Sequence, residues 1–148
     1  MDQHVHVITA ATGDLDAARR FYVDGLGWTP LLDVPGEIIF FQVAPGVVLG
    51  LFDAAAFAAD IGADSVGAST PSGFTLAHNV TGPDEVDRVL ARAARAGARI
   101  VKPAQRAAFG GYHGYFADPN GLLWEVAHNP GWRIAEDGTV LLQPVEPE

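Results

Sequence analysis

One carboxylate stands inside an apolar stretch of this sequence: Glu125 lies within LLWEVA. The segment from 110 to 130 reads as two strands joined by the turn Asp118-Pro119-Asn120-Gly121, in which proline and glycine occupy positions that they favour. Side chains alternate between the two faces of a strand, so Glu125 and Trp124 should point to opposite sides. In a cavity, Glu125 could anchor a ligand amine or act as a general base. The alternative is a structural role, in which it pairs with an arginine or caps backbone amides.

The histidines are the other candidates for chemistry, at positions 4, 6, 78, 113 and 128. His78 alternates with Leu76 and Val80, which should pack toward helices, so a structural role is its simpler interpretation. His113 lies in the strand opposite Glu125, although alternation could place it on the other face. If a divalent metal binds, the 2-His-1-carboxylate arrangement of His78, His113 and Glu125 is the form that the site would take.

Composition and charge exclude several classes of function. The chain has 148 residues, of which 49% are hydrophobic, and a formal net charge of −9, which disfavours nucleic acid or an anionic membrane as a partner. Without cysteine there is no thiolate catalysis and no Cys-ligated metal. The start lacks a signal-peptide pattern and no apolar run is long enough to span a membrane, so we expect a cytoplasmic protein. The arginines at 88, 92, 95 and 99 follow helical spacing and are interpreted as a solvated, salt-bridged face.

The elements that must position these residues occur twice. Residues 5–11 predict a strand, a helix begins after Asp14, and strands follow at 28–34, 37–44 and 47–53, with Gly25 expected to end the helix in the left-handed conformation. A second strand, at 74–80, precedes a helix that ends at Gly97, a strand at 99–102 and the hairpin of Glu125. The pairs 14/84 and 27/97 share the same separation, which indicates an internal repeat.

This repeat predicts an α+β fold: two tandem βαβββ modules that form a cupped, eight-stranded mixed sheet around a cavity. Residues 1–53 would form the first module, 54–72 a linker or flap with a short helix around Phe57, and 73–130 the second module. Residues 131–148 would be a C-terminal tail.

Two motifs then resemble a known family. GDLDAARRFYVDGLGWTP, from Gly13 to Pro30, is similar to the first helix of the vicinal-oxygen-chelate superfamily, and YFADPNGLLWEVAHNP, from Tyr115 to Pro130, is similar to its last hairpin. That superfamily includes glyoxalase I, extradiol dioxygenases, and bleomycin and fosfomycin resistance proteins. The resemblance implies the paired-module fold, and also a homodimer, because related proteins often complete the cavity across a subunit interface.

In metal-dependent members of this superfamily, four strand residues converge on one cation. The resemblance places these positions at Val7, near Gly50, at Thr75 and at Glu125. Only Glu125 keeps a ligand type, and catalytic metals ordinarily take at least three protein ligands. We therefore expect no cofactor, with a divalent metal as the alternative.

Without a metal, the fold would leave an apolar, aromatic-lined cavity for a small organic ligand. Its expected lining is Phe40, Gln42, Leu49, Leu51, Phe109, Tyr112, His113, Glu125 and Trp132. Two classes of function remain. The first is a binding protein that holds a small, partly aromatic or cationic molecule. The second is a lyase, isomerase or dioxygenase of the superfamily in which Glu125 is the base or a metal ligand, so whether the chain is an enzyme stays open.

Overall fold

The computed structural model describes residues 1–64, 74–108 and 110–142. The first module contains β1 (Val7–Thr12), α1 (Leu15–Arg19), η1 (Arg20–Gly25), β2 (Leu32–Val34), β3 (Ile38–Ala44) and β4 (Val47–Asp53). Its sheet has the order β1-β4-β3-β2, with β1 parallel to β4 and the other pairs antiparallel. A short helix, α2 (Ala54–Asp60), follows where the sequence predicted one.

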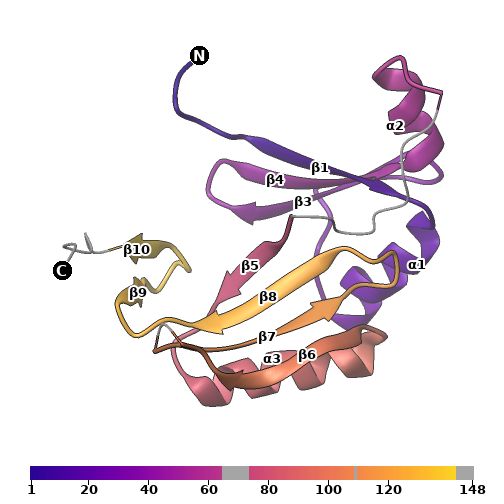
Figure 1. Cartoon of the computed structure of the whole chain (residues 1–148). Coiled ribbons are helices and arrows are strands. Elements are labelled where there is room, and N and C mark those ends of the chain that lie inside the picture. Colours follow the sequence, from indigo (N-terminus) through magenta and orange to yellow (C-terminus); the bar gives the residue numbers. More distant parts are fainter. Residues whose placement is uncertain (65–73, 109, 143–148) are drawn as a thin grey trace.

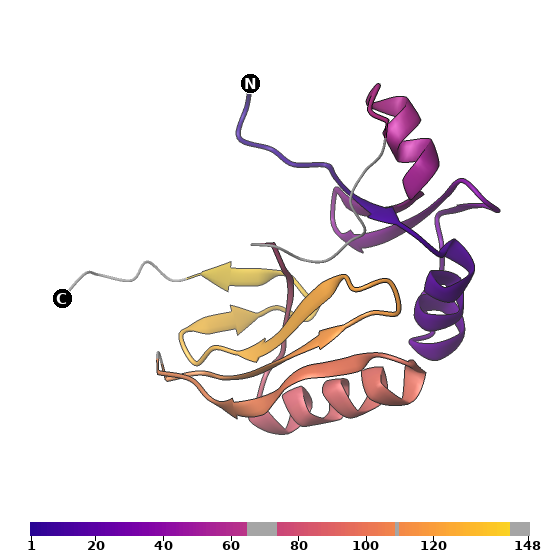
Figure 2. The same ribbon diagram turned by 45° about the vertical axis from the view of Figure 1, so that its right-hand side comes forward.

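The second module repeats this plan with β5 (Leu76–Asn79), α3 (Pro83–Ala96), β6 (Arg99–Arg106), β7 (Tyr112–Ala117) and β8 (Leu123–His128). Its sheet has the order β5-β8-β7-β6, and β5 is parallel to β8. The tandem βαβββ fold and its α+β class are therefore confirmed. The sequence predicted one eight-stranded sheet. The described strands instead form two sheets of four, which no strand pairing joins, and a separate two-stranded sheet near the C-terminus. The two larger sheets lie as separate layers in Figures 1 and 2.

The first helix begins as the sequence predicts and ends differently. Asp14 caps it by accepting a hydrogen bond from the backbone N–H of Ala17 at 2.9 Å. The prediction of a left-handed Gly25 was wrong, because the helix continues through the π-helical turn η1 and Gly27 takes the left-handed conformation, with φ of +75°. Gly25 serves a different purpose. A Cβ at this position would come within 2.5 Å of the Cβ of Ala96, so glycine allows η1 to approach α3 closely.

The core lies where the helices meet the inner faces of both sheets, and Tyr22 of η1 stands at its centre with no exposed surface. The Tyr22 hydroxyl donates a hydrogen bond to Asp118 at 2.7 Å and accepts one from the indole N–H of Trp124 at 3.0 Å. Asp118 also accepts the backbone N–H groups of Asn120 and Leu122, which fixes the turn between β7 and β8. One buried network therefore ties the first module to the hairpin of the second.

Three segments differ from their predicted structure. The strand predicted at 28–34 begins only at Leu32, because the Trp28 ring packs against Tyr22 and Phe41 instead. The strand predicted at 99–102 continues to Arg106. Part of the predicted tail forms a hairpin of β9 (Trp132–Ile134) and β10 (Val140–Leu142). Within the described ranges, no helix is both long and apolar enough to cross a membrane.

Candidate functional site

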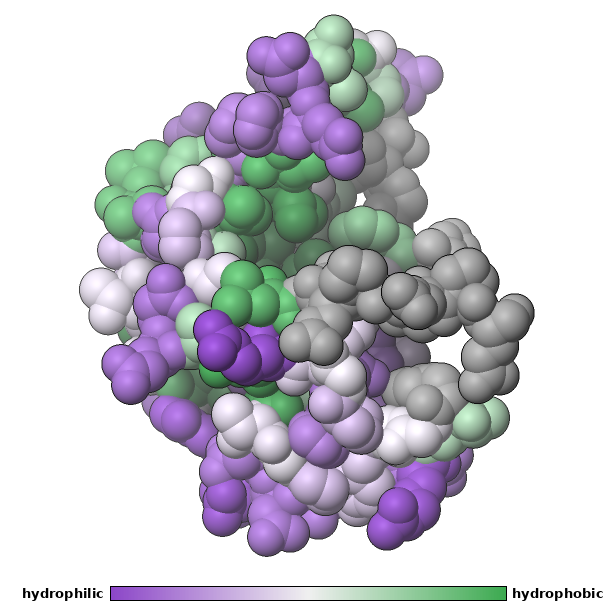
Figure 3. Space-filling view, turned by 90° about the vertical axis from the view of Figure 1, so that its left-hand side faces the viewer, coloured by the Kyte–Doolittle hydropathy of each residue, from purple (hydrophilic) through white to green (hydrophobic). Residues whose placement is uncertain are grey.

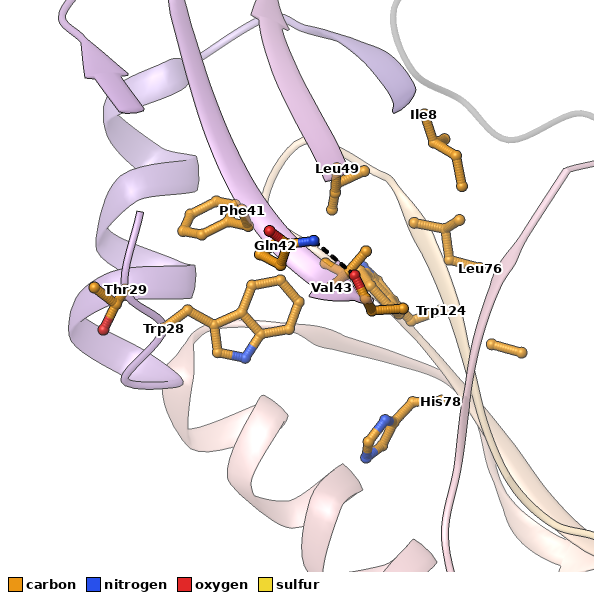
Figure 4. A pocket seen from close by; sticks show the side chains of 12 residues that line it. Ile8, Trp28, Thr29, Phe41, Gln42, Val43, Leu49, Leu76, His78 and Trp124 are labelled. Atoms are coloured by element: carbon orange, nitrogen blue, oxygen red, sulfur yellow. Dashed lines mark hydrogen bonds between the residues drawn. The ribbon is translucent and has the colours of Figure 1, made fainter. Parts of the chain in front are cut away.

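A cavity of about 610 Å³ lies between the two modules, next to the side of the sheets on which the helices pack. Its apolar wall comes from Ile8, Trp28, Phe41, Leu49, Leu76 and Trp124, and its polar side chains are Thr29, Gln42 and His78. Figure 4 shows Trp28 and Phe41 on one side of this space, with Leu76 and His78 of β5 across from them. The volume is in the range of small-molecule pockets.

The strand registers explain why these residues meet. Ile8 of β1 pairs with Leu49 of β4, and Leu76 of β5 pairs with Trp124 of β8. β1 and β5 each lie at one edge of their sheet, and both contribute side chains, Ile8 and Leu76, to the cavity lining. The Trp28 ring meets the Trp124 ring edge-on, with centroids 5.9 Å apart, which gives the cavity a rigid aromatic wall.

Gln42 and His78 are two of the polar side chains that line the cavity. The register of β3 shifts between Gln42 and Ala44, and the Gln42 amide donates to the Ala44 carbonyl at 2.8 Å (Figure 4). His78 lies at the rim, where burial disfavours its charged form and lowers its pKa below the ordinary 6.5. This shift favours the neutral imidazole, which can both donate and accept a hydrogen bond.

A smaller chamber of about 160 Å³ adjoins the cavity and shares Trp28, His78 and Trp124 with it. The remaining lining comes from Tyr22, Leu26, Val89, Arg92, Phe116 and Val126. Arg92 extends from α3 and donates a hydrogen bond to the backbone carbonyl of Leu26 at 2.6 Å. This contact holds the guanidinium at the chamber. Arg92 is exposed, as the predicted solvated arginine face requires, and it also borders the chamber.

The open face of the second sheet holds a separate polar pair. His113 Nδ1 and Glu125 Oε1 are 2.7 Å apart, with side chains 10% and 21% exposed. Tyr115 pairs with Glu125 across the strands, and burial together with the negative charge of Glu125 raises the pKa of the Tyr115 hydroxyl. His78 pairs with Val126, and strand alternation turns it to the opposite face from Glu125. The predicted arrangement of His78, His113 and Glu125 around a metal is therefore wrong.

The family positions for metal ligands do not provide a donor set in this chain. Val7 is half exposed and has no donor atom. Gly50 lies beneath the Phe40 ring, which an added Cβ would meet at 2.9 Å. The Thr75 hydroxyl donates a hydrogen bond to the Leu123 carbonyl at 3.1 Å. Among the described residues, no three histidine or acidic side chains come together in a group that could hold a metal ion.

The predicted lining residues divide among several places. Leu49 and Gln42 line the cavity, while Leu51 is in the core. Phe40 covers Gly50, and His113 and Glu125 lie on the open face. Tyr112 lies on the α3 side, where its hydroxyl donates to Asp87 at 2.9 Å. Trp132 is 41% exposed on β9, and Phe109 lies outside the described residues.

Sequence reasoning missed the residues that enclose the cavity most closely, above all Trp28, Trp124 and His78. A signal for Trp124 was present, because alternation along β8 already placed it opposite Glu125. Trp28 was assigned to a strand, and Arg92 to a solvated helix face. Their positions depend on how η1 packs against α3, which one sequence does not reveal.

Comparison with known proteins gives the family context. Residues 4–126 match the profile of the Glyoxalase/Bleomycin resistance protein/Dioxygenase superfamily. No curated protein matches the sequence.

Solved structures extend the likeness to nearly the whole chain. A glyoxalase-related enzyme from Fulvimarina pelagi is 42% identical, with a TM-score of 0.86, over 96% of this chain and 99% of that one. A glyoxalase/bleomycin resistance protein/dioxygenase from Nocardioides is 29% identical, with a TM-score of 0.70, over 86% and 84% of the two chains. A lactoylglutathione lyase from Agrobacterium tumefaciens is 24% identical, with a TM-score of 0.64 over 86% and 95%, and shows a similar fold.

Proposed function

This chain belongs to the glyoxalase/bleomycin resistance protein/dioxygenase superfamily, and from that premise we propose that it binds a small, largely apolar organic molecule in the cavity between its modules. The observation that carries the proposal is the enclosure of about 610 Å³ by Trp28, Phe41, Leu49 and Trp124. Aromatic walls bury flat ligands well, and the few polar groups, including His78, would set the ligand's orientation.

Binding of indole, a neutral bicyclic aromatic molecule, tests this proposal. Titration calorimetry should give a saturable one-to-one isotherm with a dissociation constant below about 1 mM, which corresponds to roughly −4 kcal/mol. In Leu76→Trp the new ring fills the cavity, and the affinity should fall at least about tenfold. The control is Val101→Trp, which adds the same ring at an exposed position that does not line the cavity. Equal indole affinity in all three proteins would contradict the proposal.

We also propose that the ligand binds without a metal ion. The support is the donor set: a half-exposed valine, a glycine beneath a phenylalanine ring and a hydrogen-bonded threonine stand where ligands would be needed. Protein purified without chelator should therefore contain substoichiometric metal by mass spectrometry. One equivalent of Fe, Mn, Ni or Zn would contradict this part of the proposal.

We propose a homodimer as the assembled form. The β1 edge has no partner strand among the described residues, and Val5 and Val7 beside it are 65% and 50% exposed. Uncovered edges of this kind are typical places for association. Figure 3 shows hydrophobic side chains gathered around a hollow on one face. Sedimentation at micromolar concentration should give about twice the chain mass of 15.6 kDa, and a species of the chain mass alone would overturn the dimer.

A second function rests on a different observation, the contact of 2.7 Å between His113 and Glu125 beside Tyr115. A carboxylate held by a histidine on a reachable face is suited to proton abstraction, as a lyase, isomerase or dioxygenase of the superfamily would need. Loss of S-lactoylglutathione, with and without added divalent metal, is the corresponding assay. Activity that Glu125→Gln abolishes would favour this enzyme over the binding protein.

A further inference from the structure

We propose that the molecule bound in the cavity is an apolar anion, whose flat body lies against Trp28 and Trp124 and whose acidic group reaches Arg92 in the adjoining chamber. The inference rests on the proposed function, since it names the ligand class of the same site. Small aromatic or branched aliphatic carboxylic acids have this chemistry.

The charged groups around the two chambers carry the argument. None of the residues described as lining either chamber is acidic, although the chain as a whole has a formal charge of −9. The ionisable side chains at the smaller chamber that can bind an anion are His78 and Arg92. His78 belongs to both chambers, so a ligand that extends from the larger into the smaller one passes beside it.

The Arg92 guanidinium is held in place by one hydrogen bond and keeps further donors for an anionic ligand. One terminal nitrogen donates a hydrogen bond to the Leu26 carbonyl at 2.6 Å, which fixes the planar group without neutralising its charge. A guanidinium has five N–H donors, so the others remain suited to a carboxylate. Within the described part of the chain, no acidic side chain forms an ion pair with Arg92, whereas Arg88, one turn earlier, pairs with Glu85.

The acidity of the whole chain argues in the other direction, toward the cationic ligand that was one of the alternatives left open by the sequence. Salt screens exposed charges beyond about 8–10 Å, so the distant carboxylates act weakly at the chamber. The Arg92 guanidinium borders the chamber itself, well within that distance, so it acts more strongly on a ligand there than the distant carboxylates do. Glu125 does not oppose it from within the cavity, because strand alternation turns its side chain to the other face of β8 from Trp124.

Three probes with one ring system test the ligand class: indole, which is neutral, indole-3-acetate, an anion, and tryptamine, a cation. Titration calorimetry at about 0.15 M salt should give at least tenfold tighter binding for indole-3-acetate than for indole, and the weakest binding for tryptamine. If indole binds and the acetate binds no tighter, the ligand class is wrong while the proposed function stands. If none of the three binds, the proposed function itself fails.

Three variants locate the charge. Arg92→Met removes the guanidinium and keeps the apolar stem, so the preference for the acetate over indole should fall to about threefold or less. Arg95→Met is the matched control, because Arg95 is exposed on the same helix and does not line either chamber, and it should keep the full preference. His78→Gln tests the second polar group and should reduce the preference by less than Arg92→Met does. Full preference in Arg92→Met, or tightest binding of tryptamine, would overturn the inference.

Discussion

Trp124 and Glu125 are neighbours on β8 and face two different environments. Trp124 is 8% exposed, stacks on Phe116 and donates its indole N–H to Tyr22. Glu125 lies on the open face, 21% exposed, with His113 as its hydrogen-bond partner. The helix side of this sheet is therefore a packed aromatic layer that encloses a cavity, and the open side carries a polar pair within reach of solvent.

The two carboxylates of the hairpin show what this difference means. Asp118 is 5% exposed and accepts hydrogen bonds from Tyr22 and from two backbone N–H groups. Burial raises its pKa, an effect that these hydrogen bonds oppose. A carboxylate with every donor supplied by the fold serves the structure, whereas Glu125 has only side-chain partners, His113 and Tyr115, and lies beside open space.

Replacement of Asp118 should have the largest effect. Asp118→Ala strands the Tyr22 hydroxyl and the backbone N–H groups of the turn, and each buried donor left without a partner costs about 1–3 kcal/mol. We expect a loss of roughly 3–5 kcal/mol in the free energy of unfolding, measured by urea denaturation with an unchanged slope.

Asp137 provides the matched control, because it accepts hydrogen bonds from Thr139 in an exposed turn rather than in the core. Asp137→Ala should change the urea midpoint only slightly. If the two variants lost equal stability, the buried network would not be what joins the modules.

Trp124→Phe should have an intermediate effect. The smaller ring leaves a void beside Trp28 and removes the donor to Tyr22, which together cost about 1–3 kcal/mol. Trp132→Phe, on exposed β9, is the control and should unfold like the parent protein. Equal unfolding midpoints for the Trp124 variant and the parent would mean that the aromatic layer is looser than its geometry indicates.

His78 should make the helix side sensitive to acid. Its pKa in the folded protein is below the ordinary 6.5, so the unfolded chain binds the proton more readily. The contribution of His78 to the free energy of unfolding is therefore fully present above pH 6.5. It is lost as the pH falls below that value toward the pKa of His78 in the folded protein. His78→Gln should flatten the decline of unfolding free energy just below pH 6.5, an effect smaller than that of either core variant. Parallel curves for parent and variant would contradict it.

Much of the fold was predictable because its signals are local. Asp14 caps its helix, Gly97 ends the next one in the left-handed conformation, and Gly121 closes the predicted turn. The helix cap, the helix end and the turn each depend on residues only a few positions apart. The alternation that separates Trp124 from Glu125 is local in the same way. The family motifs at 13–30 and 115–130 fall largely within the residues that match its profile.

Most of the cavity lining was not predictable, because it depends on contacts between distant segments. Gly25 was expected to end a helix, whereas its lack of a side chain lets η1 lie against Ala96 of α3. That approach places Trp28 and Arg92 at the chambers, and no pattern near either residue reports it. The dimer, the absence of a metal and the cytoplasmic location stay predictions.

Glu125→Gln should have the smallest effect on stability and is the direct test of the open face. Glutamine keeps the shape of the side chain and can still hydrogen-bond His113, so the variant loses the charge and little else. The sequence left open a buried arginine as the partner of Glu125, and removal of one member of such a pair costs about 3–5 kcal/mol. The partners in the structure are His113 and Tyr115, and the side chains of Glu125 and His113 both retain some exposure. The free energy of unfolding should therefore stay within about 1 kcal/mol of the parent value. Urea denaturation beside the exposed control Glu136→Gln measures the difference, and a loss as large as that of Asp118→Ala would show that the Glu125 charge supports the fold.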